Sequence, residues 1–227
     1  METIIEFKNI KKAYGDKVVL EDFNLIVEKG EFVTIIGSSG CGKTTALKMI
    51  NGLIEPTSGD ILVEGKNIHD KNLTELRRHI GYAIQGSVLF PHMTVEQNIS
   101  YVPHLLNKKD KEKTHLAVSK WMKIVGLDEE LKERYPLELS GGQQQRVGIA
   151  RALAASPDIL LMDEPFGALD EITRGQLQIE SKQIYEKTGI TILFVTHDIS
   201  EALKLGTKVL VIDKGVIQQY DTPHELL

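Results

Sequence analysis

The sequence predicts an α/β fold with a parallel sheet and a helical insertion, and three observations lead to this prediction. Apolar runs typical of buried strands alternate with segments of helical periodicity in both halves of the chain. The region between about Thr94 and Ala155 is by contrast almost wholly helical in pattern. A length of 227 residues with 41% hydrophobic and 26% charged residues suits an ordinary globular chain.

The N-terminal part is expected to form short strands before the first helix. Turn signals at Tyr14-Gly15-Asp16 and Lys29-Gly30 separate the segments. The predicted strands cover residues 4–7, 18–20, 25–27 and 32–36. A glycine-rich loop follows the last strand, and a helical pattern then runs from Lys43 to about Ile50.

Strands and helices continue to alternate along the rest of the chain. Further strands are predicted at 58–63 and 80–84. In the helical region one helix carries Val118, Trp121, Met122 and Val125 on one face, and Gly126 is its expected stop. After Pro157 the predicted elements are strand 159–162, helix 171–187, strand 191–195, helix 199–205 and strand 209–212.

Composition excludes several classes of protein. The net charge of −5 disfavours non-specific nucleic-acid binding, and the single cysteine rules out a disulfide framework. No apolar run is long enough to cross a bilayer, and the first residues lack the pattern of a signal peptide. A cytosolic location is therefore expected, and any membrane role must come through a partner.

A phosphate-binding loop is predicted between the strand at 32–36 and the helix from Lys43. Residues 37–44 fit the pattern G-x-x-x-x-G-K-[ST]. Its glycines let backbone N–H groups turn around phosphate oxygens, Lys43 can reach the β and γ phosphates, and the Thr44 hydroxyl can bind Mg²⁺. The candidate nucleotide-binding residues are Gly37, Ser38, Ser39, Gly40, Cys41, Gly42, Lys43, Thr44 and the adjacent Thr45. Cys41 is interpreted as a small residue that fits a tight loop rather than as a redox group.

Two acidic residues follow the apolar strand at 159–162. Asp163 and Glu164 lie directly before Pro165, which ends the strand. Ligands of parallel α/β sheets bind at the carboxyl ends of strands, so these acids are expected to share one edge with the phosphate loop. Nucleotide hydrolysis needs a carboxylate for the Mg²⁺ shell and a group that positions water. Asp163 is assigned to the metal and Glu164 to the water.

A second anion-binding helix start is predicted at Leu139-Ser140-Gly141-Gly142-Gln143. Ser140 is a natural N-cap, and the two glycines leave the amides of the first turn open. Because residues 37–44 are already expected to bind the phosphates of one nucleotide, this second anion-binding site is expected to bind a nucleotide held by another copy of the chain. The sequence therefore predicts a head-to-tail dimer with two shared sites.

Together these motifs resemble the ATP-binding cassette (ABC) family over essentially the whole chain. Further matches are Gln85 after a strand, Gly167-Ala168-Leu169-Asp170 as the D-loop and Thr196-His197-Asp198 as the switch. The resemblance implies a P-loop NTPase core (RecA-like) of the ABC type, with an antiparallel β subdomain and an α-helical insertion. It implies a single ABC ATPase domain over 1–227, divided into a core with the β subdomain at about 1–85 and 157–227 and a helical signature subdomain at about 86–156.

The same resemblance implies roles for single residues. Tyr14 would stack on adenine, Gln85 would touch the metal and the water and respond to a membrane partner, and His197 would contact the γ-phosphate. Glu164 would position or deprotonate the attacking water. The signature residues Ser140, Gly141, Gly142 and Gln143 would act on the nucleotide of the opposite subunit. Asp170 joins the nucleotide-binding set, and the implied ligands of Mg²⁺ are Thr44, Gln85 and Asp163.

The chain is more specifically similar to ATPase subunits of bacterial importers of quaternary amines and osmoprotectants, such as glycine betaine, carnitine and choline. This similarity lies in segments 85–94, 102–106, 139–147, 166–174 and 219–223. This implies a homodimer that hydrolyses ATP on the cytoplasmic side of the membrane, with transmembrane permease subunits and an extracytoplasmic solute-binding protein or domain as partners and no nucleic acid. One alternative is an importer ATPase for another polar solute such as an amino acid. The other is a soluble ABC ATPase of DNA repair or the ribosome, although such proteins usually carry a long coiled coil or two cassettes.

The last residues are expected to start a helix. Thr222-Pro223-His224-Glu225 has the pattern of a capped helix start, but only two residues follow, and so short a helix is marginal. Osmoprotectant importer ATPases often continue into a C-terminal regulatory region. Residue 227 is therefore expected to be a point where the chain was cut or shortened.

Overall fold

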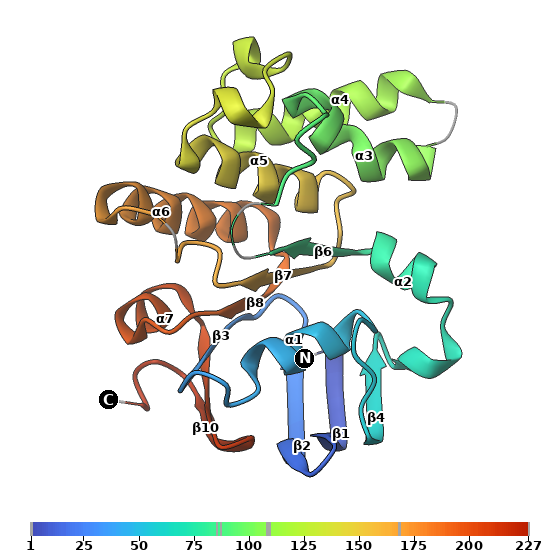
Figure 1. The fold of residues 1–227 in the computed structure, drawn as a ribbon, viewed down its shortest axis with the longest axis vertical. Helices are drawn as coiled ribbons and strands as arrows, with labels where there is room; N and C mark the ends of the chain where they lie inside the picture. The colour runs from blue at the N-terminus through green and yellow to red at the C-terminus, as the bar shows by residue number, and fades with distance from the viewer. Residues whose placement is uncertain (1, 85, 87, 108–109, 168, 227) are drawn as a thin grey trace. The chain divides into compact units, whose positions relative to one another are not determined.

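The computed structural model, drawn in Figure 1, describes residues 2–84, 86, 88–107, 110–167 and 169–226. The contacts between its residues divide the chain into two compact units. The first unit comprises residues 1–77 and 190–227, and the second comprises residues 78–189. The functional boundaries expected near residues 86 and 156 stay a prediction.

The first unit contains an antiparallel sheet with strand order β2-β1-β4-β5. Its strands are β1 (Thr3–Tyr14), β2 (Lys17–Glu28), β4 (Ser58–Val63) and β5 (Lys66–Asn67). The first two form a hairpin in which Tyr14 pairs with Lys17, so the predicted turn at residues 14–16 is confirmed. The two short strands predicted at 18–20 and 25–27 are wrong, because β2 is continuous. A register shift, with Asp22 at a φ of 44°, accommodates the charged residues between them.

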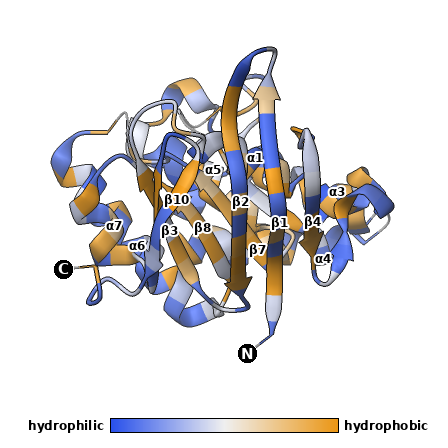
Figure 2. Ribbon diagram, turned by 90° about the horizontal axis from the view of Figure 1, so that it is seen from below, coloured by the Kyte–Doolittle hydropathy of each residue, from blue (hydrophilic) through white to orange (hydrophobic). Residues whose placement is uncertain are grey.

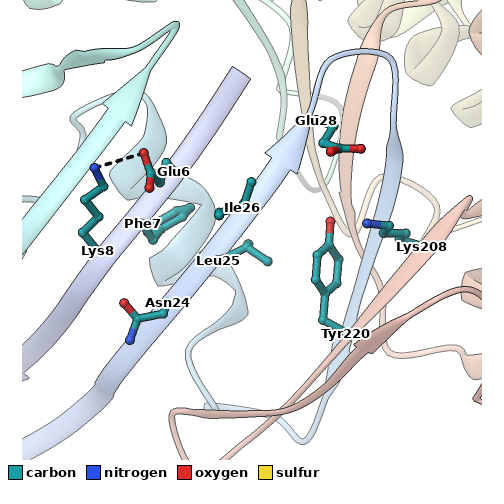
Figure 3. Close-up of a pocket in the computed structure, with 9 residues that line it drawn as sticks. All are labelled: Glu6, Phe7, Lys8, Asn24, Leu25, Ile26, Glu28, Lys208 and Tyr220. Atoms are coloured by element: carbon teal, nitrogen blue, oxygen red, sulfur yellow. Dashed lines mark ion pairs between the residues drawn. The ribbon is translucent and has the colours of Figure 1, made fainter. Parts of the chain in front are cut away.

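A second group of strands in the first unit has the order β10-β9-β3-β8. Strands β3 (Phe32–Gly37), β8 (Thr191–Val195) and β9 (Lys208–Asp213) run parallel, and β10 (Val216–Asp221) is antiparallel to β9. Figure 2 shows hydrophobic residues predominating along β3, whereas β2 alternates between hydrophobic and hydrophilic positions. Every residue of β8 is buried, as expected for a central parallel strand. Helix α1 (Lys43–Ile50) follows β3, helix α7 (Ile199–Leu205) connects β8 to β9, and both helices match their predicted spans.

The second unit combines two parallel strands with helices. Strands β6 (Ile80–Ala83) and β7 (Ile159–Asp163) pair in parallel. The helices are α3 (Val95–Asn107), α4 (Lys111–Ile124), α5 (Gly141–Leu153) and α6 (Glu171–Thr188), with short 3₁₀ turns at Glu129–Leu131 and Pro136–Glu138. Val118, Trp121, Met122 and Val125 are buried as their spacing predicts, and Gly126 follows the helix end with a φ of 67°. The mainly helical character predicted for residues 94–155 is confirmed.

Three short elements lack a strong sequence pattern and were not predicted. Helix α2 (Leu73–Arg78) buries only Leu76, strand β5 has two residues, and β10 carries polar residues at most of its positions. The expected helix start at Thr222 is instead a turn, in which the Glu225 amide donates to the Thr222 carbonyl oxygen at 3.1 Å. The Thr222 hydroxyl donates to the Glu225 carboxylate at 2.7 Å, a bond between two side chains that differs from the side-chain-to-backbone pair of a capping box.

Candidate functional site

The loop between β3 and α1 has a backbone that requires glycine at two positions. Gly37 has a φ of 154°, and a Cβ atom there would lie 2.1 Å from the carbonyl oxygen of Ile212. Gly42 has a φ of 109°, and a Cβ atom there would lie 2.5 Å from Leu20 Cδ2. Gly40 also has a positive φ, of 78°, but faces open space. The glycines of the predicted phosphate loop therefore shape a tight turn in the way the motif predicts.

Lys43 is folded into this loop at the first position of α1. It is 6% exposed, and its Nζ donates hydrogen bonds to the carbonyl oxygens of Gly37 at 2.8 Å and Ser38 at 3.0 Å. The helix begins after Gly42, and no side chain caps its start. A buried ammonium beside a helix N-terminus without a side-chain cap is a local concentration of positive potential, which suits a phosphate group.

The other loop residues are distributed between the surface and the interior. Ser38, Ser39 and Gly40 are exposed, whereas Thr44 and Thr45 are partly buried in the first turn of α1. Cys41 is 4% exposed, and its Sγ lies where a Cβ atom on Gly37 would approach it to 2.7 Å. This packing agrees with the interpretation of Cys41 as a small residue that fills a tight loop.

The carboxylate pair follows a strand that is buried throughout its length. All five residues of β7 are buried, and Asp163 is 6% exposed. Glu164, the next residue, is partly exposed and adopts a left-handed backbone with a φ of 43°. Such a conformation is uncommon for a residue with a side chain and turns the chain sharply at the strand end.

Tyr82 of β6 is a neighbour of Asp163 that the sequence did not reveal. Burial and the negative charge of Asp163 both raise the pKa of the Tyr82 hydroxyl above its ordinary value. The phenol therefore stays neutral over the physiological range. No spacing rule links position 82 to position 163, because the two residues meet only through the pairing of two distant strands.

The second predicted helix start has the expected cap. Ser140 Oγ accepts a hydrogen bond from the Gln143 amide at 3.2 Å, and the Gln143 side chain accepts one from the Ser140 amide at 2.9 Å. This reciprocal pair is a capping box, and it confirms Ser140 as the N-cap of α5. A Cβ atom on Gly142 would lie 2.7 Å from Thr173 Cγ2, so glycine also permits close packing against α6.

Removing this cap is expected to cost stability before any ligand is considered. Ser140→Ala should lower the free energy of unfolding by about 1 kcal/mol, because the Gln143 amide loses its acceptor. Urea denaturation without nucleotide measures the change, and Ser140→Thr, which keeps the hydroxyl, is the matched control. Equal stability of the alanine variant and the parent chain would contradict the assigned cap.

His197 is exposed and lies between two residues whose backbone is well fixed. Its neighbour Thr196 is buried and donates its hydroxyl to the carboxylate of Glu201, itself 5% exposed. The amide of Asp198 donates to Thr196 Oγ1 at 3.0 Å, and Asp198 Oδ1 caps α7 by accepting from the Glu201 amide at 3.1 Å. The sequence pattern singled out His197 but not Glu201, whose role is visible only from its burial.

The remaining candidates lie in different settings. Tyr14 is 51% exposed at the end of β1, and Lys12 Nζ lies 4.6 Å from its ring centroid. Asp170 caps α6 by accepting a hydrogen bond from the Thr173 amide at 3.0 Å, and this bond lowers the pKa of its carboxyl. Gln85, a candidate catalytic and metal-binding residue, lies outside the described residues.

Two features are absent from the described part of the chain. No three side chains of histidine, cysteine, aspartate or glutamate gather there into a cluster that could hold a metal ion. No helix there combines the length and the apolar character needed to cross a membrane.

The α/β fold and the glycine-shaped loop before α1 define a phosphate-loop nucleotide-binding protein. Residues 20–167 match the ABC transporter family, and the chain belongs to this family. It is 52% identical over 225 residues to the carnitine transport ATP-binding protein OpuCA of Listeria monocytogenes, covering 99% of this chain and 56% of that protein. It is 51% identical over 225 residues to the choline transport ATP-binding protein OpuBA of Bacillus subtilis, covering 99% of this chain and 59% of that protein.

A solved structure gives the corresponding result for the fold. The dimeric post-hydrolysis state of the ATP-binding cassette MJ0796, bound to ADP and Pi, superimposes with a TM-score of 0.85. It is 34% identical in sequence and covers 97% of this chain and 99% of that one. The predicted ABC-type fold is therefore confirmed. The chain spans between half and two thirds of the length of the two curated relatives described above.

Proposed function

We propose that this chain is the ATP-hydrolysing part of an ABC importer for a quaternary amine or osmoprotectant such as glycine betaine, carnitine or choline. The observation that carries the proposal is the loop at 37–44, where a buried lysine lies beside a helix start without a side-chain cap. The transport functions named for two relatives about half identical in sequence support the substrate class.

The residues of the loop suit the phosphates of ATP. Lys43 would exchange the carbonyl oxygens of Gly37 and Ser38 for phosphate oxygens, which carry more negative charge. The hydroxyl of Thr44 and the carboxylate of Asp163 are hard oxygen donors, so they fit Mg²⁺, with Gln85 as a third proposed ligand. Bound Mg²⁺ supplies neutralisation of the phosphate charge.

Hydrolysis needs a group that handles the attacking water. We assign this role to Glu164, whose carboxylate would accept a proton from the water as its oxygen bonds to the γ-phosphorus. The bond from that phosphorus to the bridging oxygen breaks, giving ADP and phosphate. His197 would contact the γ-phosphate. The backbone on either side of His197 is fixed by the hydrogen bond from the Asp198 amide to Thr196 Oγ1. Tyr14 would stack on the adenine, and Gln85 would also respond to the membrane partner.

The helix start at Ser140 would act on a nucleotide bound by a second copy of the chain. Its capping box leaves Gly141 and Gly142 in the first turn of α5, without side chains to screen their amides. The dimer proposed here is head-to-tail, with Asp170 of the D-loop near the shared nucleotides. Permease subunits at the cytoplasmic side of the membrane and an extracytoplasmic solute-binding protein or domain would complete the importer.

Mixing two inactive variants tests both the ATPase activity and the shared sites. Lys43→Ala and Ser140→Arg chains should each hydrolyse little ATP, because both sites of their homodimers are damaged. In an equal mixture half of the dimers are mixed, and each of these has one intact site, so about a quarter of the parent rate should return. The measurement is phosphate release at a fixed total concentration.

The matched control mixes Lys43→Ala chains with chains that carry both substitutions, which leaves no intact site. A mixture no more active than this control would contradict the head-to-tail arrangement. A parent chain that neither binds nor hydrolyses ATP would contradict the proposed function itself.

A further inference from the structure

Asn98 is an interior polar residue, and its side chain makes four hydrogen bonds to the segment before α3. Its side chain is 0% exposed. Its Oδ1 accepts from the Phe90 amide at 2.9 Å, and its Nδ2 donates to the carbonyl oxygens of Phe90, Met93 and Thr94 at 3.0–3.1 Å. One buried amide therefore replaces the backbone partners that residues 90–94 would find in a helix or a sheet.

Arg151, in the last turn of α5, also contacts this segment. Its Nη2 donates to the Val88 carbonyl oxygen at 2.7 Å, and its Nη1 donates to Asn98 Oδ1 at 3.4 Å. The guanidinium carbon also lies 5.2 Å from the centroid of the Phe90 ring. Asn98 of α3 and Arg151 of α5 thus form one polar bracket around residues 88–94.

The other end of α5 is the helix start at Ser140, so one rigid element joins the signature to the bracket. The C-terminal turn of α5 also packs tightly on β6, because a Cβ atom on Gly81 would lie 2.6 Å from the Ala152 carbonyl oxygen. A short helix transmits a displacement of one end to the other with little bending. The bracketed segment reaches the surface through Val88, which is 61% exposed.

We infer that Asn98 and Arg151 are positioning residues that make segment 88–94 follow the signature helix when nucleotide binds. The inference rests on the function proposed above, since it needs nucleotide to engage Ser140. The inference adds a mechanical link between the engagement of nucleotide by Ser140 and residues 88–94, which lie shortly after Gln85 in the sequence. A purely structural role for the bracket would instead make the segment equally ordered with and without nucleotide.

Hydrogen exchange separates these two roles. In chains carrying Glu164→Gln, Mg-ATP should change the exchange of peptides covering 140–147 and 88–94 together. Adding Arg151→Lys removes the bidentate grip, so exchange in 88–94 should become about tenfold faster with ATP and lose its dependence on nucleotide. The response of 140–147 should remain. Arg146→Lys is the matched control, because Arg146 lies on the same helix but bonds to Gly126 and Glu180.

Phe90→Leu is the second variant, since it removes the ring beneath the guanidinium without removing a hydrogen bond. It should reduce the nucleotide response of 88–94 in the same direction. An unchanged response in Arg151→Lys, or the same loss in Arg146→Lys, would overturn the inference. Absence of any ATP effect at 140–147 in the Glu164→Gln chain would overturn the proposed signature function and the inference with it.

Discussion

Replacing Glu164 with glutamine is expected to lower the rate of ATP hydrolysis about 100- to 10,000-fold while ATP still binds. Glutamine keeps the shape and the polarity of the side chain but cannot accept a proton from the attacking water. The residue stands directly after the buried strand β7, with a φ of 43°. Because glutamine has to adopt the same backbone as glutamate, the substitution tests chemistry rather than folding.

Single-turnover phosphate release and equilibrium ATP binding measure the two halves of this prediction, and gel filtration with Mg-ATP should show a stabilised dimer. Glu171→Gln is the matched control, because Glu171 is an exposed acid in the first turn of α6 and has no proposed role in hydrolysis. Hydrolysis at the parent rate in Glu164→Gln would remove Glu164 from the catalytic role.

Gly37→Ala is expected to be the most damaging single-methyl change in the phosphate loop. The added Cβ would lie 2.1 Å from the Ile212 carbonyl oxygen, so β9 and the loop must separate. A cost of about 2–4 kcal/mol in the free energy of unfolding is expected from such overpacking, together with loss of ATP binding. Gly40→Ala adds the same methyl group in open space at a φ of 78° and should cost only about 1 kcal/mol.

Urea denaturation of the two variants and ATP titration measure these effects. Both variants place alanine at a positive φ, which costs free energy. Only Gly37→Ala also brings the added methyl group against β9, so the difference in stability between the two variants reports that steric cost. If the two variants were equally stable, close approach to β9 would not be the reason for glycine at position 37.

Much of the fold could be predicted because strong local patterns coincide with its elements. Phosphate-loop glycines fix the end of β3 and the start of α1, and Ser140 with Gln143 fixes the start of α5. The errors occur where local patterns are weak or misleading. The polar Glu21-Asp22 pair suggests a break, yet a bulge absorbs it within β2. Strand β10 forms by pairing with β9, which its own polar sequence does not indicate.

The candidate site divides in the same way. Motifs single out Lys43, Glu164 and His197 as candidates because the chemistry proposed for them depends on a fixed position in the chain. The supporting residues Tyr82, Glu201 and Asn98 have no such signature, because each acts through contacts with residues distant or irregularly spaced in sequence. Their importance follows from burial, which a single sequence does not reveal.

The caps of the helices carry a further consequence, which concerns charge rather than geometry. Helices α4, α6 and α7 begin at aspartates, namely Asp110, Asp170 and Asp198, whereas α1 and α5 begin at the neutral residues Gly42 and Ser140. An aspartate cap neutralises its own helix end and repels a second anion. A serine hydroxyl that accepts from an amide still has a proton to donate. The cap residues of the two helix starts proposed to bind phosphate thus carry no negative charge. Ser140→Asp should therefore keep the cap of α5 while abolishing the affinity of this helix start for a polyanion.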